Sequence, residues 1–426
     1  MTHSTHRRTL LKGIVAGSTL TFAGLATAEG HGRYLVRAGD GNVEDRVRDE
    51  GFEVENRLAG GQVLVMSGEA DRSDDLRGIE GVAEAAPDVR FELERPAETE
   101  SADVDAGDGA PALFDLQWDK HVTEVRATHE SATGSGSRLA IIDTGVDHTH
   151  QDLGNVNSGA SVSIIDGEVG GHVGDAYSHG THVAGITAAT GAVGVLGTAP
   201  DAELVSVRVF PEDEPLASFS DILLAMEYAA DVGADAANMS IGTPPIPPAA
   251  NANQYRRVME PVAQGVTSQG TLLVGSAGNG DANLQQGGRF TLPNSLEGVT
   301  GISATGPNDQ RAFYSNYGTN EIDVGAPGGG YETLEKTLEE EGVEYPFPTN
   351  LVLSTVPGDG YAWFAGTSMA APQVTGTAGL VREVAPGANA NRVERAIKGG
   401  ADIVAGENDP DLGAGRLNAA DAVDDA

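Results

Sequence analysis

The sequence feature that most constrains the fold is a short polar motif followed by a long run of small residues. The motif spans 366–372 and reads GTSMAAP, and Ala, Gly, Thr and Val dominate the run up to Val381. A helix that begins at Thr367 holds the Ser368 hydroxyl at its positive dipole end, and Pro372 is tolerated because the first turn needs few backbone donors. Taken alone, the Thr-Ser pair is more simply the N-cap of an ordinary buried helix. In either case, the small side chains predict a helix at the centre of the domain.

From Leu113 onward, strand patterns alternate with helix patterns. Apolar runs without in-and-out alternation are typical of parallel strands covered on both faces. They lie at 138–142, 204–209, 236–240, 271–274 and 298–303, and helices are expected at 220–232, 252–269 and 391–398. Polar residues follow several of these strands, at the edge where open parallel sheets bind their ligands. The pattern predicts an α/β fold with a mostly parallel sheet.

The N-terminus carries an export pattern. Arg7 and Arg8 precede a modestly apolar stretch, 13–28, that ends in Ala-Thr-Ala. This stretch is too short and too rich in Gly, Ser and Thr to span a bilayer. It predicts a cleavable twin-arginine signal over 1–28, and therefore export of a folded protein to the outside of the cell.

Two further segments precede the α/β region. Residues 31–95 alternate strand and helix patterns and predict a small βαββαβ module, with its last strand at 88–93. Residues 96–111 are rich in Gly, Ala and Asp and have little to bury. They predict an exposed linker that proteases can cut.

The charge is strongly acidic. Asp and Glu number 63 against 26 Lys and Arg, the formal net charge is -37, and the lysines are Lys12, Lys120, Lys336 and Lys398. Such a surface repels nucleic acids and anionic membranes. Acidic surfaces poor in lysine resemble those of haloarchaeal proteins, so molar salt is the expected medium, although a merely soluble acidic protein is the alternative. With no cysteine, disulfides and thiolate metal sites are excluded.

Three polar motifs follow one another along the chain. Asp143 begins the sequence DTG directly after a predicted strand, His179 lies in SHGTH at the start of a small-residue helix, and Ser368 lies in the motif described above. A serine nucleophile needs a base to accept its proton, and that base needs a carboxylate to fix its tautomer. Asp143, His179 and Ser368 supply these three groups.

These motifs resemble the three signatures of the subtilisin family of serine proteases, and the chain looks close to the secreted halolysins of that family. The match extends with few gaps from about Leu116 to Leu417. It implies a three-layer α/β/α fold with a mostly parallel central sheet and a serine endopeptidase that cleaves proteins. It also implies that 31–95 is a propeptide, that the maturation site lies in the linker 96–111, and that 112–426 is the catalytic domain.

The resemblance assigns further residues. Asn279 matches the side-chain donor of the oxyanion hole. Ser240, Ile241 and Gly242 match the segment that pairs with an extended peptide, and Ser276, Ala277 and Gly278 match the opposite wall of the primary pocket. His182 matches a buried structural histidine, and no carboxylate or thiol cluster accompanies it to form a zinc site.

No cofactor is expected for the chemistry. Asp152 matches a carboxylate that helps to hold calcium in the family, yet the companion loop 190–194 is shorter and lacks the usual asparagine. A carboxylate with backbone carbonyls can still bind a hard cation, so structural calcium at Asp152 remains open. An insertion at 329–350 is expected to form a surface helix that docks through Leu334 and Leu338.

The expected partners are protein and peptide substrates and the chain's own propeptide, which inhibits the enzyme. Nucleic acid and a membrane anchor are not expected, and a monomer is. The main alternative is a catalytically silent binding protein on the same scaffold, which the three motifs and Asn279 argue against. A serine-carboxyl peptidase of related fold needs an acidic base in place of His179.

Overall fold

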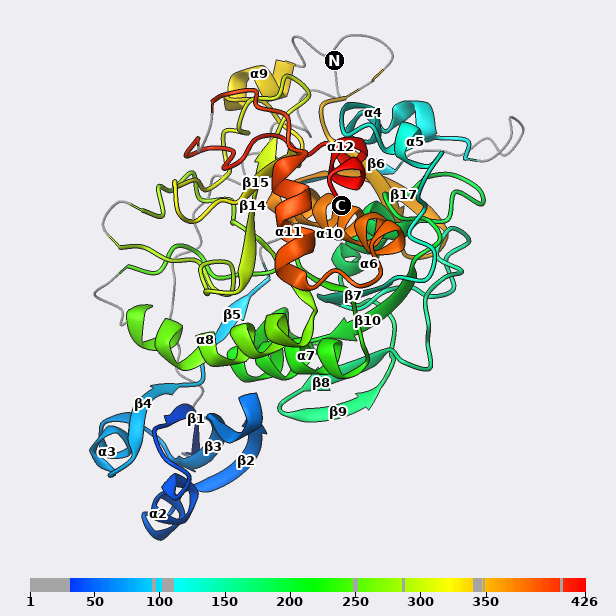
Figure 1. Cartoon of the computed structure of the whole chain (residues 1–426). Coiled ribbons are helices and arrows are strands. Elements are labelled where there is room, and N and C mark those ends of the chain that lie inside the picture. Colours follow the sequence, from blue (N-terminus) through cyan, green and yellow to red (C-terminus); the bar gives the residue numbers. More distant parts are fainter. Residues whose placement is uncertain are drawn as a thin grey trace.

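The computed structural model describes residues 31–93, 97–101, 111–247, 252–285, 288–339, 347, 349–406 and 409–426. They form a small N-terminal module (31–93) and a larger α/β unit (111–426), which lies above the module in Figure 1. The predicted signal at 1–28 and most of the predicted linker lie outside the described residues. None of the described helices is long and apolar enough to cross a membrane.

Among the described residues, eight strands form the central sheet of the α/β unit, in the order β15-β14-β13-β12-β7-β10-β8-β9. Neighbours pair in parallel as far as β8, and β9 is antiparallel to β8. The strands are β7 (Arg138–Asp143), β8 (Val162–Ile165), β9 (Glu168–Gly171), β10 (Glu203–Arg208), β12 (Ala236–Met239), β13 (Leu272–Ser276), β14 (Val299–Thr305) and β15 (Val324–Pro327). The five predicted strands are all present, and the predicted parallel sheet is confirmed.

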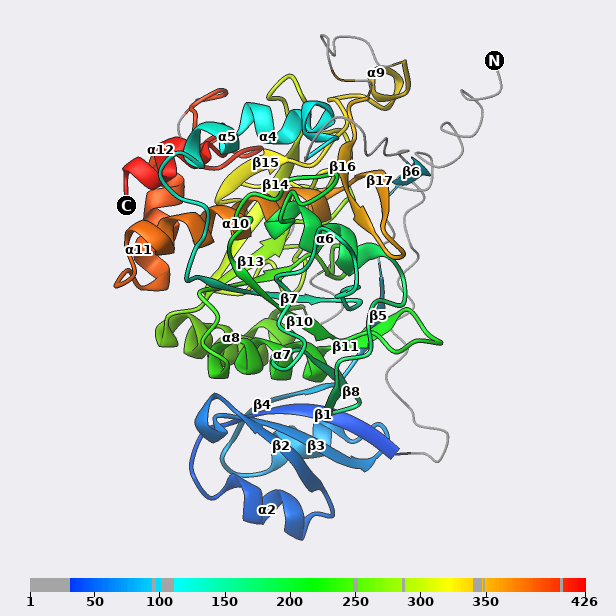
Figure 2. The same ribbon diagram turned by 90° about the vertical axis from the view of Figure 1, so that its right-hand side faces the viewer.

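Helices cover both faces of this sheet (Figure 2). In β7, Leu139 and Ile141 belong to one core, whereas Ala140 and Ile142 belong to the other. Because successive side chains of a strand point to opposite faces, the sheet is buried on both sides. One core is covered by α7 (Phe219–Asp231) and α8 (Ala252–Gln269), and the other by α4 (Trp118–Val122), α5 (Val125–Thr128), α6 (His179–Ala188), α10 (Thr367–Val384), α11 (Ala390–Gly399) and α12 (Ala419–Asp424). The three-layer α/β/α fold is confirmed.

Helix α10 is the predicted central helix. It begins at Thr367, and every residue from there to Val381 is buried. A methyl group at Gly376 would lie 2.5 Å from Cβ of Thr198 and 2.8 Å from the carbonyl oxygen of Thr187, which belongs to α6. The absence of a side chain at Gly376 therefore lets α6 and α10 pack backbone against backbone.

A second, small sheet leads into α10. Its strands have the order β16-β17-β6, with bounds β16 (Val352–Val356), β17 (Gly360–Ala365) and β6 (Ala97–Ser101). The segment 97–101, which the sequence predicts to be part of an exposed linker, forms a strand whose backbone pairs with β17. The insertion forms α9 (Leu334–Glu339), and Leu334 and Leu338 pack against the core as predicted. A short 3-10 turn, η2 (Phe114–Leu116), precedes α4.

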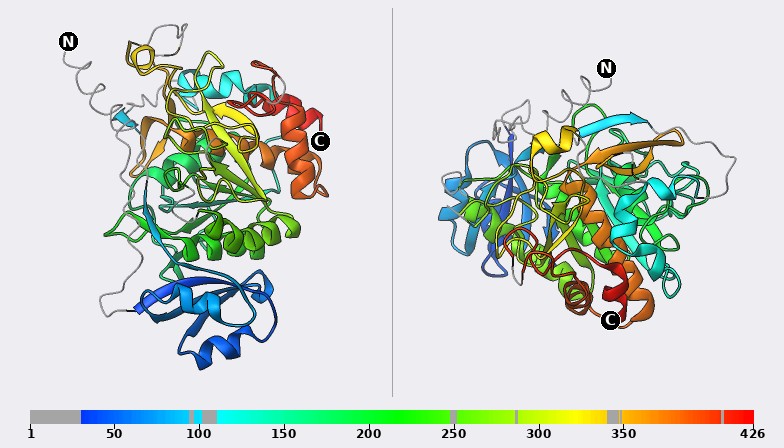
Figure 3. Two further views of the ribbon diagram at one scale, coloured as in Figure 1. Left: turned by 90° about the vertical axis from the view of Figure 1, so that its left-hand side faces the viewer. Right: turned by 90° about the horizontal axis from the view of Figure 1, so that it is seen from above.

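The N-terminal module has the predicted βαββαβ order, and Figure 3 shows it below α7 and α8. Its elements are β1 (His31–Ala38), α2 (Val43–Asp49), β2 (Glu53–Leu58), η1 (Ala59–Gly61), β3 (Val63–Glu69), α3 (Ser73–Gly78) and β4 (Val82–Pro87). The sheet is antiparallel, in the order β2-β3-β1-β4. The strand predicted at 88–93 is present as β5 (Arg90–Glu92), but it pairs with β11 (Leu216–Ser218) of the α/β unit, and the alanine-rich β4 is the last strand of the module's own sheet.

Candidate active site

The predicted site residues gather at the carboxyl edge of three neighbouring strands. Asp143 is the last residue of β7, Ser240 follows β12, and Ser276 ends β13 just before Asn279. Strand β12 pairs in parallel with β7 on one side and with β13 on the other. Parallel strands end at the same edge, so these groups are neighbours although up to 136 positions separate them in the sequence.

Asp143 and His179 form a buried hydrogen-bonded pair. His179 is the first residue of α6, and its Nδ1 atom lies 2.7 Å from Oδ1 of Asp143. The same carboxylate oxygen accepts the backbone N–H of Thr144 at 2.7 Å. A methyl group at Gly180 would lie 2.1 Å from the carbonyl oxygen of Gly145, so the glycine of the HGTH motif lets the helix start approach the strand end. The carboxylate favours the tautomer of the imidazole in which Nδ1 carries the proton.

Asp175 orders the loops around this pair and was missed by the sequence analysis. Its carboxylate accepts the hydroxyl of Thr144 at 2.8 Å, the backbone N–H of Tyr177 at 2.9 Å, and both the N–H (2.8 Å) and the hydroxyl (2.6 Å) of Thr181. Burial raises the pKa of Asp175, and these donors act against that rise. Asp175 thus joins the loop after Asp143 to the helix that carries His179.

Ser368 is the second residue of α10, as predicted. Its hydroxyl donates to the carbonyl oxygen of Ser240 at 3.1 Å, and the hydroxyl of Ser240 donates to the carbonyl oxygen of Ser368 at 2.8 Å. Asn238 donates to Ser240 Oγ at 2.9 Å and accepts from Thr375 of the same helix at 3.2 Å. These contacts attach the start of α10 to the end of β12.

Asn279 lies beside the start of the same helix. Its Oδ1 atom accepts the backbone N–H of Thr367 at 2.9 Å and the hydroxyl of Thr367 at 3.0 Å. The hydroxyl of Thr367 in turn accepts the backbone N–H of Gly278 at 3.0 Å. Because these bonds occupy Oδ1, the amide presents its two Nδ2 hydrogens on the opposite side.

The arrangement corresponds to a known family. The model of the Subtilase family matches residues 134–418. The chain belongs to the subtilase family. It is therefore a serine endopeptidase, and the resemblance stated from the three motifs is confirmed at the level of the family.

Individual relatives agree. Alkaline elastase YaB from Bacillus sp. (strain YaB) is 32% identical over 369 residues, which cover 81% of this chain and 86% of the relative. An alkaline protease from Alkalihalobacillus alcalophilus is 33% identical over 332 residues, 74% of this chain and 76% of the relative. The crystal structure of the epidermin leader peptide processing serine protease from Staphylococcus aureus has a TM-score of 0.74 and covers 93% of this chain and 98% of that one. Its identity is 20%, so this similarity shows the fold alone.

The predicted substrate segments of the protease lie on two neighbouring strand ends. Ser240, Ile241, Ser276 and Ala277 are buried, whereas Gly242 and Gly278 are partly exposed. The backbone of Gly278 has a φ of 93°, a left-handed conformation that favours glycine. The two segments therefore present mostly backbone at the carboxyl edge of the sheet.

His182 is buried and structural, as predicted. Its Nε2 atom lies 3.0 Å from the carbonyl oxygen of Ala362, and its ring stacks on Phe364 with centroids 4.1 Å apart. Burial lowers its pKa to about 3, so the ring is neutral. No group of three or more His, Asp or Glu within the described ranges is placed to hold a metal ion.

The surroundings of Asp152 do not fit the calcium site that the sequence left open. Its carboxylate accepts the backbone N–H groups of Val193 at 2.6 Å, Gly194 at 2.8 Å and Val195 at 3.0 Å, and the hydroxyl of Tyr361 at 2.7 Å. A calcium ion needs oxygen ligands, whereas this loop turns its N–H groups toward the carboxylate. The Asp152 carboxylate is therefore already bonded to four donors of the protein, and the loop offers N–H groups where a cation would need oxygen ligands.

Proposed function

We propose that the protease is a secreted endopeptidase adapted to high salt, with Ser368 as nucleophile, His179 as general base and Asp143 as the group that orients His179. The observation that carries this proposal is the hydrogen bond from the His179 ring to Asp143, beside the strand end that holds the Ser368 hydroxyl. His179 Nε2 accepts the proton of the serine as Oγ attacks the substrate carbonyl. It then donates this proton to the leaving amine.

The oxyanion formed in this step needs donors that are already in place. The Nδ2 group of Asn279, whose Oδ1 is bonded to Thr367, and the backbone N–H of Ser368 supply them. Loss of such a side-chain donor raises the activation free energy by about 3 kcal/mol, a value measured on subtilisin itself. No metal is required for this chemistry.

Substrates are extended peptides of permissive sequence. The segments 240–242 and 276–278 present backbone at neighbouring strand ends, and backbone pairing recognises a peptide with little regard to its side chains. We expect cleavage of unfolded or loosely folded proteins.

The N-terminal module is a propeptide that blocks this site. Strand β5 lies antiparallel to β11, and Leu93 donates its N–H to the carbonyl oxygen of Pro215 at 2.8 Å. Further along the chain, Ala97 of β6 pairs with Ala365, which is three residues before Ser368. The chain on either side of residues 94–96 is thus paired with the α/β unit, and on the downstream side the partner strand leads directly into the helix of Ser368. This supports a cleaved bond between Leu93 and Ala97, at the upstream edge of the predicted linker.

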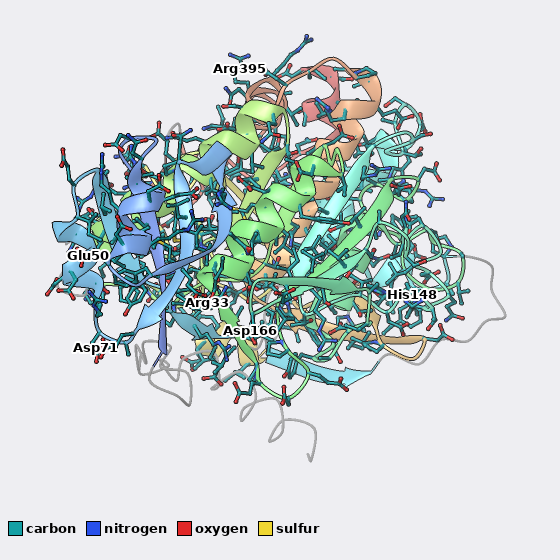
Figure 4. The ribbon with its side chains drawn as sticks, turned by 90° about the horizontal axis from the view of Figure 1, so that it is seen from below. Arg33, Glu50, Asp71, His148, Asp166 and Arg395 are labelled. Atoms are coloured by element: carbon teal, nitrogen blue, oxygen red, sulfur yellow. The ribbon has the colours of Figure 1, made fainter. Side chains whose placement is uncertain are left out.

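Ion pairs and hydrogen bonds connect the module to the α/β unit. Arg33 and Asp166 lie on the two sides of this contact (Figure 4), and Asn56 donates to the carbonyl oxygen of Gly167 at 3.3 Å. Arg257 of α8 pairs with Glu84 of β4 at 2.7 Å. Such a contact suits a module that assists folding and then has to leave.

The test is a serine-directed fluorophosphonate, followed by mass spectrometry of the labelled protein in molar salt. We expect the label on Ser368. Ser368→Ala should lose both the label and casein hydrolysis and accumulate as uncut precursor, because the hydroxyl is the nucleophile. Ser158→Ala, at an exposed serine, should behave like the wild type. An unlabelled wild type would favour the silent binding protein, and an active enzyme that begins at residue 29 would contradict the propeptide.

A further inference from the structure

A buried lysine joins the two helices that carry the proposed base and nucleophile. Lys120 lies in α4, and its side chain is fully buried although it ends in an ammonium group. Its Nζ atom donates to the carbonyl oxygen of Ile186 at 2.9 Å, to Oγ1 of Thr198 at 2.8 Å and to Oε1 of Gln373 at 2.6 Å. An ammonium group has three N–H donors, so these contacts use all of them.

Two of the three partners of Lys120 belong to the two functional helices, and the third, Thr198, lies in the chain that follows α6. Ile186 lies in the last turn of α6, the helix that begins at His179. Gln373 lies in α10, five residues after Ser368. A cation near the C-terminal end of α6 is also favoured by the helix dipole. One side chain therefore contacts the base helix and the nucleophile helix together.

Asp119 completes this contact. Its Oδ2 atom lies 3.5 Å from Nζ of Lys120 and accepts from Nε2 of Gln373 at 2.7 Å. Gln373 thus accepts from the lysine through Oε1 and donates to the aspartate through Nε2, which fixes both ends of its amide. All three side chains are fully buried. Burial lowers the pKa of Lys120 to about 8, so the amine is mostly charged at neutral pH.

Stability alone does not explain a buried charge of this kind. Replacing a buried ion pair by apolar side chains of similar volume is often neutral or stabilising, because the desolvation of two charges offsets their attraction. Geometry gives a better reason. Packing at Gly376 sets how closely α6 and α10 approach, whereas directional hydrogen bonds set how far one helix is shifted along the other.

We propose that Lys120 is a positioning residue that fixes the register of the His179 helix against the Ser368 helix. This role rests on the triad proposed above. Reacting groups have to be held within about 0.5 Å of their productive geometry, and a misplacement of about 1 Å can lower the rate by about 100-fold. Loss of the contact should therefore slow the chemical step and leave substrate binding intact.

The test is the double variant Lys120→Met with Asp119→Asn, which removes both charges and leaves neither unpaired. We expect kcat, and the rate at which a fluorophosphonate labels Ser368, to fall by about tenfold, with KM within about twofold of the wild type. The melting temperature should change by only a few degrees. Lys398→Met is the control, because it removes a lysine of α11 whose ion pairs, with Asp323 and Glu394, lie outside α6 and α10. Its kcat should equal that of the wild type.

Gln373→Met is the second variant, and it decides the question if the double variant does not fold. It removes the α10 partner of Lys120 and leaves the bond to Ile186, so we expect a smaller fall in kcat, about threefold. Unchanged kcat and labelling in a folded variant would overturn the positioning role, as would a change in KM alone. If the wild type itself is not labelled at Ser368, the proposed function fails first.

Discussion

The N-terminal module and the α/β unit differ in how their charged side chains are placed. The module has eight arginines for fifteen acidic residues, whereas the α/β unit has fourteen basic residues for forty-one acidic ones. In the module the ion pairs are largely exposed, as in Arg57 with Glu44 at 2.6 Å and Arg72 with Asp75 at 2.7 Å. The α/β unit also has ion pairs, such as Arg382 with Asp235 at 2.6 Å, but some of its carboxylates accept several backbone N–H groups of one loop.

Two loops show this second arrangement. Asp152 accepts three successive N–H groups of the loop 193–195. Glu383 of α10 likewise accepts the N–H groups of 133–135 at 2.7, 2.7 and 3.0 Å. Exposed ion pairs contribute little and are screened by salt, whereas a buried carboxylate that satisfies several donors is costly to remove. We infer that the exposed ion pairs of the module contribute little to its stability, whereas individual carboxylates of the α/β unit hold loops in place.

The largest expected effect concerns salt and the unpaired acids of the α/β unit. Lowering KCl from about 1 M to about 0.1 M lengthens the Debye length from about 3 to about 10 Å. For the Ser368→Ala chain, which cannot digest itself, we expect the melting temperature to fall by more than about 10 °C. Hydrogen exchange should show that the α/β unit loses protection before the module, because fewer cations offset its acids. A flat melting temperature would mean that the acidic surface serves solubility alone.

The next effect separates a buried carboxylate from an exposed one. Asp152→Ala leaves three backbone N–H groups and the Tyr361 hydroxyl without their acceptor, so we expect a loss of about 3 kcal/mol in the free energy of unfolding. Asp75→Asn, at an exposed ion pair of the module, should change it by less than about 0.5 kcal/mol. Denaturant unfolding in molar salt measures both. Equal losses would contradict the comparison, and a strong response of the wild type to calcium or EDTA would reopen a cation site at Asp152.

The smallest effect lies at the contact between the two regions. Asp88 of the module is fully buried there and accepts the N–H and hydroxyl of Ser220, at the start of α7, at 3.1 and 2.6 Å. Burial raises its pKa to about 6, against the opposing effects of Arg33 and Ser220. A pKa raised in the complex means that the complex takes up a proton as the pH falls through 6. The cleaved module should therefore bind more tightly at low pH and be released more readily as the pH rises.

We expect release of the cleaved module to be about tenfold faster at pH 7.5 than at pH 5, since one pKa unit corresponds to about 1.4 kcal/mol. Asp88→Asn should flatten this dependence, whereas Glu92→Gln, at an exposed residue of β5, should keep it. Inhibition that decays with time at each pH gives the release rate. Faster release at pH 5 would contradict the assignment.

The sequence predicted those parts of the fold whose signal is local. The strand at 138–142 was found because burial on both faces leaves an uninterrupted apolar run, and α10 was found from its small residues. Strand β15 reads VGAP and β9 reads EVGG, which carry little strand signal. Strand β6 was missed because its partner β17 lies about 260 positions further along the chain.

The residues of the candidate site also fall into those that a local sequence signal identifies and those that depend on distant contacts. Asp143, His179 and Ser368 could be named because each lies in a short motif, and Asn279 because it matches the family. Lys120 could not, because its partners are 66, 78 and 253 positions away and its burial follows from packing. Asp152 was recognised, but whether the loop turned carbonyl or N–H groups toward it depended on backbone geometry that composition does not encode.

The pairing of β6 with β17 has a consequence for the solubility of the newly matured enzyme. A strand with an unpaired edge is a template for association with other chains. In the uncut protein β17 is paired on both sides, by β16 and by β6. In the proposed maturation the cut leaves β6 at the new N-terminus of the enzyme, and separation of β6 from β17 would make the same row of hydrogen-bonding groups available to a substrate peptide or to the edge of a second molecule. We therefore expect the enzyme to be most prone to aggregate when it becomes active, and the mutual repulsion of its acidic surfaces to oppose that association.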